Sequence, residues 1–555
     1  MESLTKIKFS KLLLKEIKRR GVKRVFGVPG RENASILFNE AEGLDYITSR
    51  VEFNAGIAAD FTGRLTRKPQ VCFSTMGPGA ANMTTAVASA MLNHSPLIFI
   101  SAQLESDDKF FNLTHQCVDQ TSILEPISKW SYELESAEDI VWAIDNAFKV
   151  ATKEPVGPVH ISIPTNFFSK KLLISHDIDT PLAQRITPNF ENFQEATAKS
   201  VYDKLVKSKS PICLIGEGAI RIDAAESIVK FCREWNIPFV TAANAKGLTE
   251  FEDPLNYGSA SPYMEGILGY PALKHIYEPV DMLICFGYQY GDDLLPKMWN
   301  YGETKTIVSV GTNPIRQIHS KFNPDFECLG DISKFISYWS ELGSSPKENR
   351  EIRTLKDIYT EIVSSQNDSL NVLTPIQVIN VINQNLGDGV FCTDIGYYRH
   401  HAILFSRPNR VGQFFTDAGL SSFGSGLPSA IGAQLEYPEK KVFLLCGDGG
   451  FHSGSCDLET LSRYKLPVII VVMNNNAFEL IGKYQGKSNS EPNEDIVLLG
   501  YVDFVKLAEA NGCKGFKASS VAELDRTIQE HDGVSPLVIE VTMEYRDPEN
   551  FKESF

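Results

Sequence analysis

Two short polar runs near the C-terminal end of the chain have the residue types of a catalytic site: Gly-Asp-Gly-Gly at 447–450 and Asn-Asn-Asn at 474–476. Each run follows an apolar segment, at 441–445 and 467–473, whose composition predicts a buried strand. A helix is predicted from Asp457 between them. The aspartate and the second asparagine stand 27 positions apart, which suits a strand-helix-strand unit. Because parallel strands end at the same edge of a sheet, we expect both side chains at that edge, where open sheets bind ligands.

The expected ligand atoms are oxygens. The carboxylate of Asp448, the amide oxygen of Asn475 and the backbone carbonyl of Ala477 form a hard donor set that suits Mg²⁺, an ion that usually bridges to phosphate. The glycines around the aspartate would let the backbone approach a diphosphate closely; they are Gly447, Gly449 and Gly450. A turn and a strand cap would explain either run alone, but the two runs together favour a metal-diphosphate site.

The rest of the chain provides the elements that must position these groups. Short β-branched segments alternate with helical patterns, which predicts an α/β fold with parallel sheets covered by helices. The segments form three blocks, separated by stretches of linker composition at 176–195 and 343–356. The predicted strands lie at 24–28, 46–50, 70–75 and 96–102, at 211–215, 239–243, 282–287 and 307–311, and at 390–396, 441–445, 467–473 and 537–541.

Composition excludes several classes of protein. The chain has 555 residues, of which 43% are hydrophobic and 22% charged, as in ordinary globular proteins. The net charge of −15 disfavours a general binder of nucleic acid or anionic membranes. No apolar segment approaches the roughly 18 residues of a membrane span, and the N-terminal segment predicts an amphipathic helix ended by Gly21 rather than a signal. Ten scattered cysteines without a CxxC pair favour reduced thiols in a cytoplasmic protein.

The aspartate and asparagine runs together resemble the diphosphate-binding motif of thiamine diphosphate enzymes, and the resemblance covers essentially the whole chain. It implies three doubly wound parallel-sheet domains: pyrimidine-binding at 1–175, central at 190–345 and diphosphate-binding at 360–555. It also implies thiamine diphosphate and Mg²⁺ as cofactors. A homodimer or homotetramer with active sites at the subunit interface is expected, because in this family the cofactor bridges two subunits.

The resemblance also gives roles to two residues outside the motif. Glu52 leaves the predicted strand 46–50 and opens a helix at 53–67, where a lone glutamate would simply favour the helix dipole. In the family a glutamate here protonates the aminopyrimidine ring of the cofactor, and a desolvated carboxyl has the raised pKa that suits this task. Phe423, in the segment GLSSFGSGLP at 419–428, matches the apolar residue that props the cofactor.

Closer matches resemble carboxyethylarginine synthase, a member of the acetohydroxyacid-synthase-like branch. The resemblance implies a C–N bond-forming transferase that converts glyceraldehyde 3-phosphate through an acryloyl-cofactor adduct and adds an amino-acid amine, with arginine expected. The matching segments are VFGVPGRENASILFNEAEG (25–43), THQCVDQ (114–120), LNYGSASPYMEGILGYPAL (255–273), DIGYYRHHAILF (394–405) and GDGGFHSGSCDLET (447–460). Besides Glu52, the implied catalytic residues are His115, Gln116, Tyr263, His400 and Tyr545; the implied substrate-binding residues are Arg399, His115 and Tyr263.

Several features keep alternatives open. Val51 stands where relatives carry histidine, and the acceptor-side segment 476–485 is altered. Within it, Lys483 and Glu479 could contact a charged acceptor or form a solvated helix face, and the second interpretation is favoured. The principal alternative is an acetolactate-synthase-like carboligase or 2-oxo acid decarboxylase. A non-catalytic protein of the same fold is a further alternative, which the retained Glu52, Asp448 and Asn475 disfavour. No motif indicates FAD.

Overall fold

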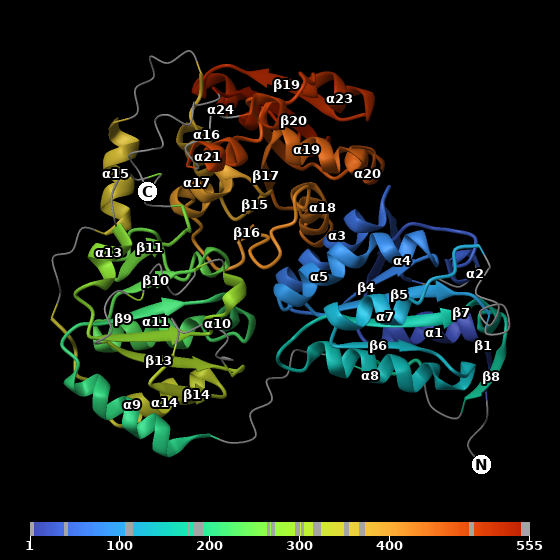
Figure 1. Ribbon diagram of the computed structural model, residues 1–555, viewed down its shortest axis with the longest axis horizontal. Coiled ribbons are helices and arrows are strands. Elements are labelled where there is room, and N and C mark those ends of the chain that lie inside the picture. The colour runs from blue at the N-terminus through green and yellow to red at the C-terminus, as the bar shows by residue number, and fades with distance from the viewer. Residues whose placement is uncertain are drawn as a thin grey trace. The chain divides into compact units, whose positions relative to one another are not determined.

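The computed structural model divides into two compact units (Figure 1): one formed by 1–187 with 431–436, the other by 188–430 with 437–555. The residues described are 5–37, 43–105, 115–174, 178–182, 193–263, 267, 272–292, 294, 300, 305–314, 323–348, 354–365, 372–487 and 493–544.

The first unit is built on a six-stranded parallel sheet with the order β3-β2-β4-β5-β7-β6, and a separate antiparallel pair, β1-β8. The strands are β1 (Thr5–Lys8), β2 (Arg24–Gly27), β3 (Asp45–Thr48), β4 (Gln70–Ser74), β5 (Leu97–Gln103), β6 (Trp130–Glu133), β7 (Val159–Pro164) and β8 (Lys171–Ile174). The α-helices are α1 (Phe9–Arg19), α2 (Ala34–Leu37), α3 (Glu52–Thr66), α4 (Pro78–Asn82), α5 (Thr84–Leu92), α7 (Gln120–Leu124) and α8 (Ile140–Thr152).

The second unit contains two six-stranded parallel sheets. The central one has the order β11-β10-β9-β12-β13-β14. Its strands are β9 (Pro211–Ile215), β10 (Phe239–Thr241), β11 (Asn256–Ser259), β12 (Met282–Phe286), β13 (Thr306–Gly311) and β14 (Phe326–Leu329). Its helices are α9 (Glu195–Lys207), α10 (Glu217–Arg221), α11 (Ala225–Trp235), α13 (Ala272–Tyr277), α14 (Ile332–Glu341) and α15 (Leu355–Ser365).

The C-terminal sheet has the order β16-β15-β17-β18-β20-β19, which repeats, strand for strand along the chain, the order seen in the first unit. Its strands are β15 (Val390–Thr393), β16 (Phe414–Thr416), β17 (Val442–Gly447), β18 (Ile469–Asn474), β19 (Lys514–Ala518) and β20 (Leu537–Thr542). Its helices are α16 (Pro375–Leu386), α17 (Tyr397–Phe405), α18 (Gly426–Glu436), α19 (Asp448–Gly454), α20 (Leu458–Tyr464), α21 (Glu479–Lys487), α22 (Glu494–Val497), α23 (Phe504–Ala510) and α24 (Val521–Gln529).

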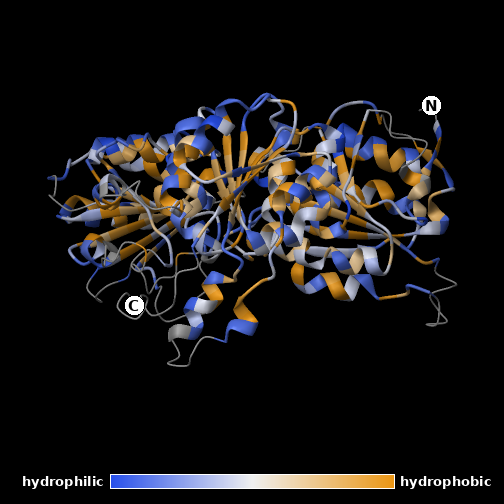
Figure 2. Ribbon diagram, turned by 90° about the horizontal axis from the view of Figure 1, so that it is seen from above, coloured by the Kyte–Doolittle hydropathy of each residue, from blue (hydrophilic) through white to orange (hydrophobic). Residues whose placement is uncertain are grey.

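Strands that are apolar along their whole length serve two cores. In β9, Ile212 and Leu214 join one hydrophobic cluster, whereas the intervening Cys213 and Ile215 join another on the opposite face. Successive side chains of a strand point to opposite faces, so a sheet covered on both faces needs continuous apolar strands rather than alternating ones. Figure 2 shows these strands as hydrophobic ribbons between helices whose outer faces are hydrophilic.

The predicted fold class is confirmed: the chain is α/β, with three parallel sheets covered by helices. The second and third predicted blocks are less separate than expected, because one hydrophobic cluster continues from the central sheet to the C-terminal sheet. No helix in the described part of the chain is long and apolar enough to cross a membrane.

Lys246 forms a buried link between these two sheets. Its Nζ donates to the carbonyl of Ile403, near the end of α17, and lies 5.6 Å from the centroid of the Phe414 ring. Burial lowers the pKa of Lys246 to about 7, because a low-dielectric surrounding disfavours the ammonium form. In the unfolded chain a lysine titrates near its ordinary pKa of about 10.4.

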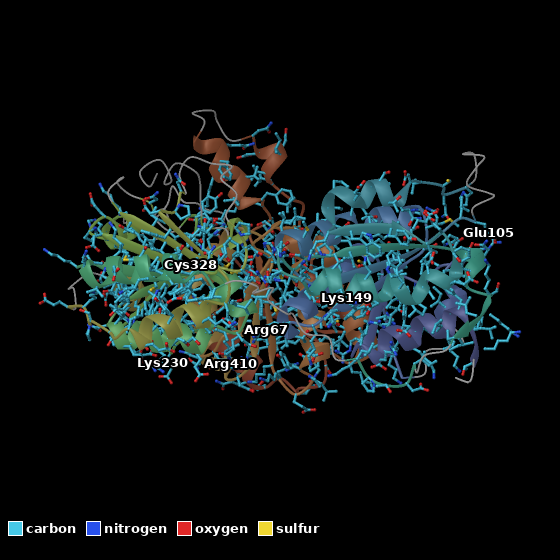
Figure 3. The ribbon with its side chains drawn as sticks, turned by 90° about the horizontal axis from the view of Figure 1, so that it is seen from below. Arg67, Glu105, Lys149, Lys230, Cys328 and Arg410 are labelled. Atoms are coloured by element: carbon cyan, nitrogen blue, oxygen red, sulfur yellow. The ribbon has the colours of Figure 1, made fainter. Side chains whose placement is uncertain are left out.

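The unfolding free energy should therefore depend on pH through Lys246. Between the folded and unfolded pKa values the unfolded chain binds more protons, so stability rises with pH from about 7 to about 10. We expect Lys246→Met to remove this rise, which amounts to about 1.4 kcal/mol per pH unit. Urea unfolding of both proteins between pH 6 and 9 checks this. Lys230→Met, on the exposed outer face of α11 (Figure 3), should keep the wild-type pH dependence. Parallel curves for Lys246→Met and wild type would contradict the prediction.

Candidate functional site

A cavity of about 590 Å³ opens at the carboxyl end of the C-terminal sheet. It lies at the point where the strand order reverses, since β15 has β16 on one side and β17 on the other, and open α/β sheets bind ligands at such points. Its walls come from the segments after β15 and β18 and from helices α17, α19 and α21. The lining includes Asp448, Asn475, Ala477, Phe423, Phe478, Tyr397, Glu479 and Lys483.

Asp448 is held at this edge by backbone donors. Its Oδ1 accepts from the N–H of Gly449 at 2.7 Å, and its Oδ2 accepts from the N–H of Ala477 at 3.3 Å. Burial raises the pKa of Asp448, although these N–H groups partly oppose the shift. The helix predicted from Asp457 is confirmed as α20, whose N-cap is Asp457, and a further short helix, α19, begins at Asp448 itself. The adjacent glycines do not break it, because Gly447 takes the extended conformation of a helix N-cap and Asp448 supplies the acidic first turn.

Asn475 lies beside this carboxylate, as the sequence predicts. Its Oδ1 accepts from the same N–H of Ala477 at 3.1 Å, so one backbone donor orients an oxygen from each side chain. Together with the Ala477 carbonyl these are the hard oxygens that Mg²⁺ takes, and the donor set fits the predicted ion. Among the described residues, no group of three or more His, Cys, Asp or Glu is placed so that it could hold a metal ion.

The glycines of the run are also required by packing. A Cβ at position 449 would lie 2.7 Å from the ring of Phe478 and 3.1 Å from that of Phe423, and one at position 450 would lie 2.9 Å from Oδ2 of Asp394. A Cβ at position 447 would likewise lie 2.9 Å from the ring of Tyr398. The chain can thus pass close to the cavity only without side chains at these positions, as a backbone that approaches a diphosphate closely would require.

Phe423 has the exposure expected of a ligand-contacting residue rather than of a core aromatic. It is 44% exposed, lines the cavity and packs edge-on against Phe478 with ring centroids 5.8 Å apart. The structure is compatible with its predicted role as a prop for the cofactor.

Tyr263 and His400, which are far apart in the sequence, come together. Their ring centroids are 4.4 Å apart, and Tyr263 also hydrogen-bonds through its hydroxyl to Tyr484 on α21. His400 Nδ1 pairs with the hydroxyl of Ser261 at 2.8 Å. Burial, helped by the neighbouring Arg399, lowers the pKa of His400 well below its ordinary value, so this histidine is neutral at pH 7. Its expected role in proton transfer stays a prediction.

Arg399 is held by contacts with a neighbouring loop. The side chain is buried and Nη1 donates to the carbonyl of Asp417 at 3.0 Å and to the hydroxyl of Ser421 at 3.3 Å. It is not among the described residues that line the cavity. These contacts tie Arg399 to the loop at 417–421, and its predicted role in substrate binding stays a prediction.

The first unit holds Glu52 at the start of α3. The side chain is buried, and its Oε2 accepts from Nδ2 of Asn82, at the end of α4, at 3.0 Å. A Cβ on Gly79 would lie 3.3 Å from its Oε1. The carboxyl group is therefore enclosed and fixed by neighbours from another helix, as a group with a defined proton-transfer direction would be.

Gln116 packs beside the start of α4, whereas His115 is exposed. A Cβ on Gly77 would be 2.7 Å from the Gln116 carbonyl oxygen, and Gly77 has a φ of +59°, so only glycine fits there comfortably. The catalytic roles of both residues stay predictions. Tyr545 lies outside the described residues.

Sequence reasoning missed Asp394 and misinterpreted α21. Asp394 follows β15, and burial raises its pKa to about 7 while the N–H groups of Ile395 and Gly424 oppose the shift. Lys483, expected on a solvated face, is buried and lies against the Tyr397 ring with Nζ 4.0 Å from its centroid. The position of Asp394 at the end of a predicted strand could have marked it as a site residue. Nothing in the sequence of the short helix indicated that Lys483 is buried.

Comparison with known proteins defines the class. Residues 7–123 match the N-terminal TPP binding domain of thiamine pyrophosphate enzymes, residues 198–338 their central domain, and residues 394–541 their C-terminal TPP binding domain. These matches together span most of the chain, which therefore belongs to the thiamine pyrophosphate enzyme family. Thiamine diphosphate with Mg²⁺ is accordingly its cofactor.

Its relatives include acetolactate synthases. The chain is 28% identical to acetolactate synthase of Bacillus subtilis strain 168, with 98% of this chain and 95% of the relative covered. It is 27% identical to a probable acetolactate synthase large subunit of Methanocaldococcus jannaschii, with 94% and 90% covered. It is 25% identical to acetolactate synthase isozyme 3 large subunit of Escherichia coli K12, with 94% of this chain and 91% of the relative covered.

Replacing Asp448, the predicted metal ligand, should weaken cofactor binding without unfolding the protein. We expect Asp448→Asn to weaken Mg²⁺-dependent binding of thiamine diphosphate by about 100-fold, because one buried charged ligand is lost. Isothermal titration calorimetry measures this affinity. With EDTA present the variant and the wild type should bind equally weakly. Asp388→Asn, on the surface of the same domain, should bind as the wild type does; equal Mg²⁺-dependent affinities for Asp448→Asn and wild type would exclude the ligand role.

The carboxyl group of Glu52 should be needed to activate the cofactor. We expect Glu52→Gln to slow exchange of the thiazolium C2 proton with D₂O by at least about 100-fold, the usual contribution of general acid-base catalysis. Quenched-flow NMR of the bound cofactor measures the rate. Glu138→Gln, an exposed position in the same unit, is the matched control. Wild-type exchange in Glu52→Gln would show that another group holds this proton.

Proposed function

We propose that the protein catalyses thiamine diphosphate-dependent decarboxylation and carboligation of a 2-oxo acid, as acetolactate synthases do. The observation that carries this proposal is the similarity to acetolactate synthases over nearly the full length of the chain. The cavity at the reversal point of the C-terminal sheet supports it, because the cavity combines hard oxygen ligands, a cradle without side chains and an apolar wall.

Each of the candidate residues, on the cavity wall and in the first unit, would have a task in that reaction. When bound, thiamine diphosphate supplies an electron sink for the pair released from the bond that joins a carboxylate to a carbonyl carbon. Asp448, Asn475 and the Ala477 carbonyl would hold Mg²⁺, and the glycine backbone would donate to the diphosphate. Glu52 would hold a proton at the other end of the cofactor. Phe423 and Phe478 would form an apolar wall beside the bound cofactor.

The narrower carboxyethylarginine synthase interpretation has less support. It rests on short matching segments, whereas the relatives reported above carry the name acetolactate synthase. The roles expected for Tyr263 and His400 do not separate the two reactions, since a neutral histidine beside a tyrosine could serve proton transfer in either. We therefore favour the 2-oxo acid reaction. The homodimer or homotetramer with shared sites, and the cytoplasmic location, stay predictions.

Two substrates distinguish the reactions. We expect the protein with thiamine diphosphate and Mg²⁺ to release CO₂ from pyruvate and to form acetolactate, measured by a coupled CO₂ assay and by NMR. It should release no phosphate from glyceraldehyde 3-phosphate, with or without arginine. Glu52→Gln is the matched inactive control. Phosphate release that depends on the cofactor and rises with an added amino acid, without CO₂ from pyruvate, would contradict the proposal and favour the C–N bond-forming reaction.

A further inference from the structure

Helix α21 places a buried ammonium group on the cavity wall. The side chain of Lys483 is 7% exposed, and its Nζ lies 3.0 Å from Oε1 of Glu479, one turn earlier. Glu479 in turn accepts through Oε2 from Nδ2 of Asn475 at 3.1 Å. The Tyr397 ring packs over the ammonium, with Nζ 4.0 Å from the ring centroid. A continuous row of polar groups thus runs from a predicted metal ligand to a buried cation.

Lys483 contributes a positive charge to a cavity whose other described charged side chains are carboxylates. Among the described residues that line it, Lys483 is the one lysine or arginine, whereas Asp448, Glu479 and Glu544 are acidic. A bound Mg²⁺ would neutralise negative charge on Asp448 and on the diphosphate at one end of the cavity. An anionic substrate entering the rest of the cavity would meet carboxylates, and Coulomb repulsion is strong in a buried site. Lys483 is the group that can offset this repulsion.

We infer that Lys483 binds the carboxylate of the acceptor 2-oxo acid, an inference that rests on the proposed function. With two pyruvates, the C1–C2 bond of the donor breaks and CO₂ leaves, while the electron pair stays on the donor C2. That carbon forms a bond to C2 of the acceptor, whose carbonyl oxygen takes one proton. Two anions and one proton therefore give one acetolactate anion and CO₂, and the acceptor carboxylate survives into the product.

The fate of the two carboxylates explains why the cation serves the acceptor. The donor carboxylate leaves as neutral CO₂, so a cation held against it would stabilise the ground state more than the transition state and slow decarboxylation. The acceptor carboxylate keeps its charge throughout, so a cation beside it stabilises bound acceptor and transition state alike. Such an interaction lowers the acceptor concentration that the enzyme needs.

The test separates the two halves of the reaction. Lys483→Gln removes the charge but keeps a donor for Glu479, and Lys483→Arg keeps the charge. With pyruvate, we expect Lys483→Gln to retain CO₂ release while its yield of acetolactate per CO₂ falls at least about tenfold, the size of a lost charged hydrogen bond. Acetaldehyde should replace the missing product. Lys483→Arg should recover most of the yield, and the exposed Lys506→Gln should match the wild type.

Cofactor affinity shows whether the Lys483→Gln variant loses product only because its site is distorted. Lys483→Gln should bind thiamine diphosphate and Mg²⁺ with wild-type affinity in calorimetry. An unchanged acetolactate yield per CO₂ in Lys483→Gln, or CO₂ release that falls in parallel with acetolactate, would overturn the assignment to the acceptor. If the wild type releases no CO₂ from pyruvate, the proposed function itself fails, and this result is distinguishable because it needs no variant.

Discussion

The N–H group of Ala477 is the contact on which the candidate site depends. It donates both to Asp448, after β17, and to Asn475, after β18, and so fixes the oxygens of two neighbouring strand ends against each other. Because burial makes the charged form of Asp448 costly, this carboxylate needs partners, and a divalent cation is the strongest partner available to it. The surrounding glycines and aromatic rings would suit a diphosphate and its metal at this point.

The same constraint explains the sheet beneath the site. β17 and β18 are buried along nearly their whole length, so their register is fixed on both faces and their last residues cannot slide. Burying each large apolar side chain contributes about 1.5–3 kcal/mol, which supports an unfavourable buried carboxylate at the strand end. The first unit repeats the strand order of this sheet but carries a different group, Glu52 at the start of α3.

The sequence was informative where a local pattern carries the chemistry. The aspartate and asparagine runs, the strand before each and the position of Glu52 are all local, and the three parallel sheets follow from alternating strand and helix patterns. The contact between Tyr263 and His400 joins residues far apart in the chain, so spacing gave no sign of it. The favoured interpretation of Lys483 was wrong because a nine-residue helix with mixed charges is typical of a solvated face. The Lys483 side chain is instead buried against the ring of Tyr397, which lies on another helix.

A crystal structure of the protein with thiamine diphosphate and Mg²⁺ would locate the metal ion and the diphosphate. We expect one Mg²⁺ about 2.1 Å from an Asp448 oxygen, the Asn475 amide oxygen and the Ala477 carbonyl oxygen, with diphosphate oxygens among its remaining ligands. An ion held by other residues, or a diphosphate bound away from Gly447, Gly449 and Gly450, would contradict it.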